Sequence, residues 1–199
     1  MRAEDVAKGS VDQRNHLIIE RLLNEITQTG DVSHDTPNYT ARGDVAPVVK
    51  LDKRLFELKA DRILPKHKLL KMFDPSTVKM LLNHSVLLKI RDNQILYKEG
   101  EEALKRAYIV LVGRIALKGF LGHSDKLGVV GYVEGGDTLG EEGLFEVASV
   151  QRRDTAVAEG DTYVFEIIKD NFEKMRSLLT SSSSTNKLDW FTLSNHMKK

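Results

Sequence analysis

The spacing of apolar positions changes near residue 86, and this change separates predicted helices from predicted strands. Before it, residues 14–28 place apolar side chains at helical spacing, and residues 65–84 contain two further helical stretches. Asp74 and Pro75 are typical of the start of the second stretch. After it, short alternating runs recur about every 8 to 12 residues with glycine turns between them, which is typical of an antiparallel sandwich or jelly roll.

This pattern predicts three parts. Residues 1–60 form an N-terminal arm with one short helix and an extended linker rich in Thr, Asp, Gly and Pro. Residues 61–180 form a mainly β domain with flanking helices, the last of them at 169–179. Residues 181–199 form a polar linker and an aromatic tail. The short helix of the arm either docks on the neighbouring domain or binds a partner, and the sequence leaves both open.

The composition is that of a globular protein, and its net charge is too small to produce a strong electrostatic field of either sign. Of the 199 residues, 41% are hydrophobic and 30% are charged, and the formal net charge of +1 favours neither nucleic acid nor an anionic membrane. The absence of cysteine excludes disulfides, thiolate metal sites and thiol catalysis. Since neither a signal peptide nor a membrane span is recognisable, we expect a cytoplasmic protein that contacts no membrane.

One stretch, residues 135–155, combines glycines, carboxylates and a pair of arginines. Gly140 can adopt positive φ and open a turn whose free N–H groups form a seat for an anion. Glu141 can accept a hydrogen bond from a ribose hydroxyl, and Arg152 or Arg153 can bind a phosphate at two points. Together these groups suit a nucleoside monophosphate. The alternative is a solvated turn whose charges form weak surface ion pairs.

Four motifs follow one another in the β-rich region: LYKEGEEA, AYIVLVGRIAL, GDTLGEEGLFE and RRDTAVAEGDTYVFEI. Residues 86–179, which contain them, resemble a cyclic nucleotide-binding domain, the module of protein kinase A regulatory subunits, cyclic nucleotide-gated channels and the bacterial catabolite activator protein. The third motif resembles the opening of the family's phosphate-binding cassette, and the fourth resembles the cassette's arginine and the strands after it. The resemblance implies a β-roll (a double-stranded β-helix, or jelly roll) that binds cAMP or cGMP without a further cofactor.

The resemblance also implies a role for each cassette residue. Gly140 would offer its backbone N–H, and Glu141 would accept the ribose 2′-hydroxyl. Arg152 would pair with the cyclic phosphate, although the motif Arg-x-Thr-x-Val assigns that role to Arg153, so the register stays open. The residues that would form the cradle are Gly140, Glu141, Arg152, Arg153, Asp154 and Thr155.

Three features of the cassette depart from the family pattern. The segment between Glu141 and the arginines is longer than usual, and Glu142 stands where an apolar residue is common. Asp154 stands where a small residue is common, and its carboxylate would repel a phosphate unless an arginine neutralises it. An ion pair between Asp154 and an arginine would occupy the group meant for the phosphate.

The family also uses a lid residue from a C-terminal helix that stacks on the base. Trp190 or Phe191 is the candidate here, and such a stack is worth about 1–3 kcal/mol per base. The alternative is that both side chains anchor the tail to the domain or to a partner.

These observations support three hypotheses about function. The first, which we prefer, is a non-enzymatic sensor that binds cAMP or cGMP and relays binding to a protein partner through its flanking C-terminal helix, the N-terminal arm and the tail. The second is a ligand-free β-roll scaffold subunit of a larger assembly, cytoskeletal or ciliary. The third is a metal-dependent cupin-like enzyme, which needs clustered histidines, whereas only His123 lies within the predicted roll. We expect no catalytic or metal site and no contact with nucleic acid.

Overall fold

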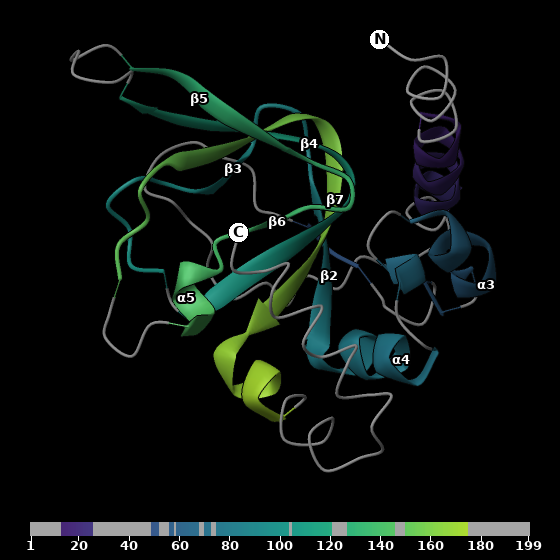
Figure 1. Ribbon diagram of the computed structural model, residues 1–199. Helices are drawn as coiled ribbons and strands as arrows, with labels where there is room; N and C mark the ends of the chain where they lie inside the picture. The colour runs from purple at the N-terminus through teal and green to yellow at the C-terminus, as the bar shows by residue number, and fades with distance from the viewer. Residues whose placement is uncertain are drawn as a thin grey trace, which may run out of the picture.

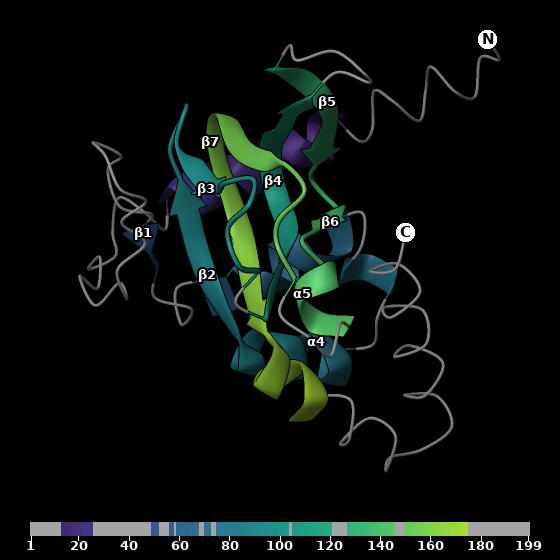
Figure 2. The same ribbon diagram turned by 90° about the vertical axis from the view of Figure 1, so that its left-hand side faces the viewer.

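The protein is built on one antiparallel sheet of seven strands, seen from two directions in Figures 1 and 2. The computed structural model describes residues 13–25, 49–51, 56–57, 59–67, 70–72, 75–103, 105–120, 127–145 and 150–174. The strands within these ranges are β1 (Val49–Lys50), β2 (Ser85–Ile90), β3 (Ile95–Tyr97), β4 (Arg106–Phe120), β5 (Leu127–Glu134), β6 (Thr138–Leu139) and β7 (Thr155–Ile168). They follow the spatial order β1–β2–β7–β4–β5, with β3 beside β7 and β6 beside β4.

Short helices flank the sheet. The described ones are α3 (Ala60–Ile63), α4 (Pro75–His84), α5 (Glu142–Phe145), the 3-10 turns η1 (Leu64–Lys66) and η2 (Leu70–Met72), and the helical residues 13–25 and 169–174. α4 begins at Pro75, since proline tolerates the first helical position. Within the described part of the chain, no helix is long and apolar enough to cross a membrane. The predicted mainly β architecture with flanking helices is confirmed.

The long strands β4 and β7 contribute to two apolar clusters, one on each face of the sheet. On β4, Ile109 belongs to the cluster that the helices cover, and Val110 belongs to the cluster inside the roll, because successive side chains of a strand point to opposite faces. On β7, Phe165 and Val164 divide in the same way. Burial on both faces explains why these two strands are continuously apolar in the sequence.

The helix over residues 13–25 packs on the helix-covered cluster of the sheet. Its buried side chains are Ile19, Leu22 and Leu23. The Tyr163 hydroxyl on β7 donates a hydrogen bond to Oδ1 of Asn24 at 2.7 Å, which fixes the helix against the sheet. This helix, expected as part of an N-terminal arm, therefore shares its core with the β-rich domain. The domain boundaries at residues 60 and 180 stay a prediction.

Candidate functional site

Gly140 forms a sharp turn between β6 and α5, with a φ of +75°. Glycine adopts this left-handed conformation without the steric penalty that a side chain brings. A Cβ here would also collide with Nη1 of Arg152 and lie 3.1 Å from its Cζ. The turn predicted at Gly140 is present and leads into the short helix α5, which Figure 2 shows below β6. Residue 140 therefore requires glycine for two independent reasons.

Backbone pairing with the loop after β3 positions Arg152. Its N–H donates to the carbonyl of Glu101 at 2.8 Å, and its own carbonyl accepts from the N–H of Gly100 at 2.9 Å. Because successive side chains of an extended segment point to opposite sides, Arg152 turns inward and Arg153 turns outward. Arg152 is 3% exposed, whereas Arg153 lies in solvent. Of the two arginines, the fold therefore brings Arg152 to Gly140.

The guanidinium of Arg152 donates four hydrogen bonds within the protein. Nη1 donates to the carbonyl of Gly140 at 3.0 Å and to Oε1 of Glu142 at 2.7 Å. Nη2 donates to the carbonyls of Ala103 at 3.1 Å and Arg106 at 2.9 Å. Three of these acceptors are neutral backbone groups, and the fourth is a carboxylate. The arginine is thus held rigidly, and the part of it nearest Gly140 already faces a negative charge.

The aromatic ring of Tyr97 supports the guanidinium. Cζ of Arg152 lies 4.4 Å from the centroid of this ring, a cation–π contact worth about 2 kcal/mol when desolvated. The ring of Tyr108 stacks behind Tyr97 with centroids 6.3 Å apart. Burial raises the pKa of both phenols, so neither ionises near neutral pH. Arg152 is therefore a cation that rests on two neutral tyrosine side chains.

Glu141 lies directly after the glycine turn and is partly buried. One of its carboxylate oxygens accepts a hydrogen bond from the hydroxyl of Thr138. Burial raises the pKa of Glu141, the Thr138 hydrogen bond opposes this, and the charge of Glu142 adds to it. The side chain is thus an acceptor beside the turn, held in place by the end of β6.

Asp154 lies directly before β7, and Thr155 is the first residue of that strand. Burial raises the pKa of the Asp154 carboxyl, despite its hydrogen bond with Tyr97 and the positive charge of Arg152. Its Oδ1 is buried without a hydrogen-bond partner among the described residues. The hydroxyl of Thr155 accepts from the N–H of Glu99 at 3.0 Å. The carboxylate that forms an ion pair with Arg152 is that of Glu142, at 2.7 Å.

A family model described as the cyclic nucleotide-binding domain matches residues 87–177. The chain belongs to the cyclic nucleotide-binding domain family. The matched segment contains the glycine turn, α5, Arg152 and all of β7. A comparison with curated proteins finds no match.

The chain is also similar to several solved structures. A cyclic nucleotide-binding-like protein from Brucella abortus is 30% identical over 58% of this chain and 96% of its own, with a TM-score of 0.45. A cyclic nucleotide-binding domain from Methylobacillus flagellatus is 19% identical, covers 80% of this chain and 88% of its own, and has a TM-score of 0.57. The N-terminal domain of a Streptomyces coelicolor transcriptional regulator is 16% identical over 65% of this chain and 86% of its own, at a TM-score of 0.52. The last two show that the fold is shared.

Three residues considered in the sequence lie outside the part of the chain that the structure describes. They are the two lid candidates of the cyclic nucleotide-binding domain and the histidine of the predicted roll: Trp190, Phe191 and His123. Among the residues that are described, no three His, Cys, Asp or Glu side chains gather in a way that could hold a metal ion.

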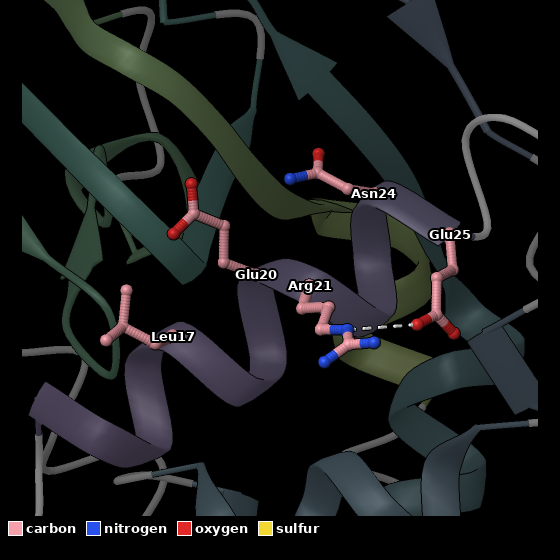
Figure 3. Close-up of a pocket in the computed structure, with 5 residues that line it drawn as sticks. All are labelled: Leu17, Glu20, Arg21, Asn24 and Glu25. Carbon is pink, nitrogen blue, oxygen red and sulfur yellow. Dashed lines mark ion pairs between the residues drawn. The ribbon is translucent and has the colours of Figure 1, made fainter.

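Two hollows lie beside the helix over residues 13–25, and none of the six residues predicted to form the cradle, from Gly140 to Thr155, lines either of them. The smaller one, about 410 Å³, is shown in Figure 3, where Arg21 and Glu25 form an ion pair at 3.4 Å on its rim. The larger one, about 690 Å³, extends from this helix to β4 and to Asp161 on β7. Both belong to the helix-covered side of the sheet.

The groups that hold Arg152 were not recognisable from the sequence. The carbonyls of Ala103 and Arg106 carry no signal in the residue type, because every residue has a carbonyl. Tyr97 lies in the motif LYKEGEEA, and an aromatic residue there was the one available signal. Glu142 was recognised as a departure from the family pattern, but its pairing with Arg152 depends on tertiary structure.

Proposed function

We propose that the protein is a non-enzymatic regulatory protein that binds cAMP or cGMP and relays binding to a protein partner. The observation that carries this proposal is the guanidinium of Arg152, held 3.0 Å from the Gly140 carbonyl inside a cyclic nucleotide-binding domain. A guanidinium beside a glycine turn supplies the positive charge and the close backbone approach that a cyclic phosphate needs. Glu141, next in the chain, supplies an acceptor for a ribose hydroxyl.

The support around Arg152 favours binding because the group is already ordered. Two backbone carbonyls hold Nη2, and the Tyr97 ring holds the plane of the guanidinium. A ligand phosphate would therefore meet an arginine whose conformational entropy is already lost. In this arrangement Nη1, on the Gly140 side, is the group that would turn to the phosphate.

Lys105 and Arg106, where β4 begins, give a physical route from this site to the C-terminal helix. The carbonyl of Arg106 holds Arg152, and the carbonyl of Lys105 accepts a hydrogen bond from Lys169 N–H at 2.8 Å, where the helix over residues 169–174 begins. Nη1 of Arg106 also pairs with Glu166 on β7 at 2.8 Å. A ligand that changes the contacts of Arg152 would shift this segment and the helix attached to it.

The relay requires a surface for a partner. On the helix over residues 13–25, Leu17, which lines the hollow of Figure 3, is 63% exposed, and the adjacent Ile18 is 39% exposed. Exposed apolar side chains next to a hollow are a feature of protein interaction sites. We propose that this helix, part of the N-terminal arm, takes part in partner binding.

A second candidate function is a β-roll scaffold subunit that binds no nucleotide and belongs to a cytoskeletal or ciliary assembly. One observation favours it: both terminal nitrogens of Arg152 are engaged inside the protein, one of them with the carboxylate of Glu142. An arginine satisfied in this way needs no ligand to complete its hydrogen bonds.

Calorimetric titration with cAMP and cGMP separates the two candidates. The sensor predicts saturable heat for the unaltered protein, none for Arg152→Ala and an unchanged affinity for Arg153→Ala, whose side chain lies in solvent. Thermal unfolding of each variant verifies that it is folded at the titration temperature. If neither nucleotide gives heat at millimolar concentration with folded protein, the scaffold is the correct function. If Arg153→Ala alone loses binding, the phosphate seat is at Arg153.

A further inference from the structure

Of the four acceptors around Arg152, Glu142 is the only one that is charged and the only one that belongs to a side chain. The backbone carbonyls are fixed by the fold, whereas the Glu142 side chain has rotatable bonds and is 28% exposed. Rotation of this side chain would carry its carboxylate into water without moving α5. Of the four contacts, the one with Glu142 is therefore the contact that a ligand can replace with the least change to the fold.

The carboxylate of Glu142 has the chemistry of the group that it would give way to. A cyclic phosphate carries one negative charge and accepts hydrogen bonds through its oxygens, as a carboxylate does. Oε1 of Glu142 lies 2.7 Å from Nη1, a normal length for a charge-assisted hydrogen bond. The position beside Gly140 that a phosphate oxygen would occupy is thus filled by an oxygen of the protein.

We propose that Glu142 determines the affinity of the site by occupying Arg152 in place of the ligand phosphate, so that a nucleotide binds only by displacing this carboxylate. This rests on the proposed function. Glu142 is distinct from Glu141, the carboxylate next to the turn, which bonds to Thr138 and not to the arginine. The affinity of the unaltered protein is therefore lower than that of the same site with a neutral residue at position 142.

The neighbouring carboxyls repel the Glu142 carboxylate and a bound phosphate alike. Glu142 interacts unfavourably with the carboxyls of Glu141 and Asp154, so its departure from the site relieves part of this repulsion. A phosphate that replaces it meets the same two groups. Binding therefore replaces one anion, the Glu142 carboxylate, by another, the ligand phosphate, on the same arginine. The contacts that the protein makes with the base and the ribose then decide whether the nucleotide displaces the carboxylate.

The test compares Glu142→Gln with the matched control Glu102→Gln in titrations with cAMP and cGMP. Both changes remove one negative charge near the cassette, but Glu102 is exposed and its side chain is not bonded to Arg152. We expect Glu142→Gln to lower Kd about tenfold, the scale of one charge-assisted hydrogen bond. Glu102→Gln is expected to change Kd by no more than about twofold, because its effect is only long-range and screened.

The outcomes separate this proposal from the proposed function. If the unaltered protein binds nucleotide and Glu142→Gln binds no more tightly, Glu142 does not compete with the ligand, and nucleotide binding still stands. If both variants tighten equally, the effect is one of general charge and the proposal is also overturned. If only Glu142→Gln shows measurable binding, competition by Glu142 is supported, and the proposed function of the unaltered protein as a sensor is overturned. If neither variant nor the unaltered protein binds, the proposed function itself is wrong.

Urea unfolding of Glu142→Gln, Arg152→Ala and the double variant measures the same contact without nucleotide. A coupling between the two changes is expected, because each removes the same ion pair. Additive effects would show that the pair does not form in solution, and this would overturn the proposal whatever the titrations give.

Discussion

Gly140 and Arg152, separated by 12 positions in the chain, are in direct contact: Nη1 of the arginine donates to the glycine carbonyl at 3.0 Å. The contact is possible because residue 140 has no side chain, since a Cβ would lie 3.1 Å from Cζ of the arginine. The turn and the cation therefore form one unit, and a change in either should disturb the other.

Gly140→Ala tests this unit. We expect a loss of unfolding free energy of about 3 kcal/mol, because the left-handed φ and the collision with Arg152 both oppose a Cβ. Gly160→Ala is the matched control, since Gly160 has a φ of +81° with no atom within 4 Å of an added Cβ. It should lose only about 1 kcal/mol. Equal losses in urea unfolding would show that the arginine does not pack against residue 140.

Arg152→Ala should destabilise the protein by about 3 kcal/mol. The change leaves the carbonyls of Ala103 and Arg106 and the carboxylate of Glu142 without their donor. Arg153→Ala, at the adjacent exposed position, should stay within about 0.5 kcal/mol of the unaltered protein. Chemical unfolding of both variants checks this, and a neutral effect of Arg152→Ala would contradict the described bonds.

Tyr163→Phe should weaken the attachment of the helix over residues 13–25. Loss of the 2.7 Å bond to Asn24 should lower the unfolding free energy by about 1 kcal/mol and speed amide hydrogen exchange in this helix. Arg21→Ala is the control, because its ion pair with Glu25 is solvent-exposed and worth little. Unchanged exchange in Tyr163→Phe would mean that the helix is held by its apolar contacts alone.

The pH dependence of stability should report the buried carboxyl of Asp154. Burial raises the pKa of Asp154 above its ordinary value of 3.8, so its ionisation in the folded protein is unfavourable. The stability that the carboxyl contributes is fully present below the pKa of the unfolded chain and is lost as pH rises through the higher folded pKa. Asp154→Asn should therefore gain stability relative to the unaltered protein as pH rises from about 3.5 to 7. Urea unfolding across this range measures the difference, and a constant difference would contradict the raised pKa.

The sequence predicted the β-roll because its signal is local. Alternating apolar runs, glycine turns and the motif GDTLGEEGLFE all lie within short windows, and each places its own element. The resemblance to the cyclic nucleotide-binding domain implied an arginine at the phosphate seat, and the glycine turn at Gly140 was predicted from its own local signal. The register between Arg152 and Arg153 was not, because it depends on the pairing of Arg152 with Glu101, half the domain away in the chain.

Two other features required tertiary structure. The docking of residues 13–25 depends on one apolar stripe that fits the sheet, and the same stripe would equally suit a partner. The choice of Glu142 over Asp154 as the partner of Arg152 depends on the position of α5, and the sequence shows only that both are acidic. In each case the sequence shows the chemical character of the residues, but it does not determine which part of the fold they contact.

A crystal structure of the protein grown with saturating cAMP would show directly which group Nη1 of Arg152 bonds to when the ligand is bound. We predict an oxygen of the cyclic phosphate about 3 Å from Nη1, beside Gly140, with the carboxylate of Glu142 turned to solvent. Glu142 still bonded to Arg152, with the nucleotide bound elsewhere or absent, would contradict this prediction.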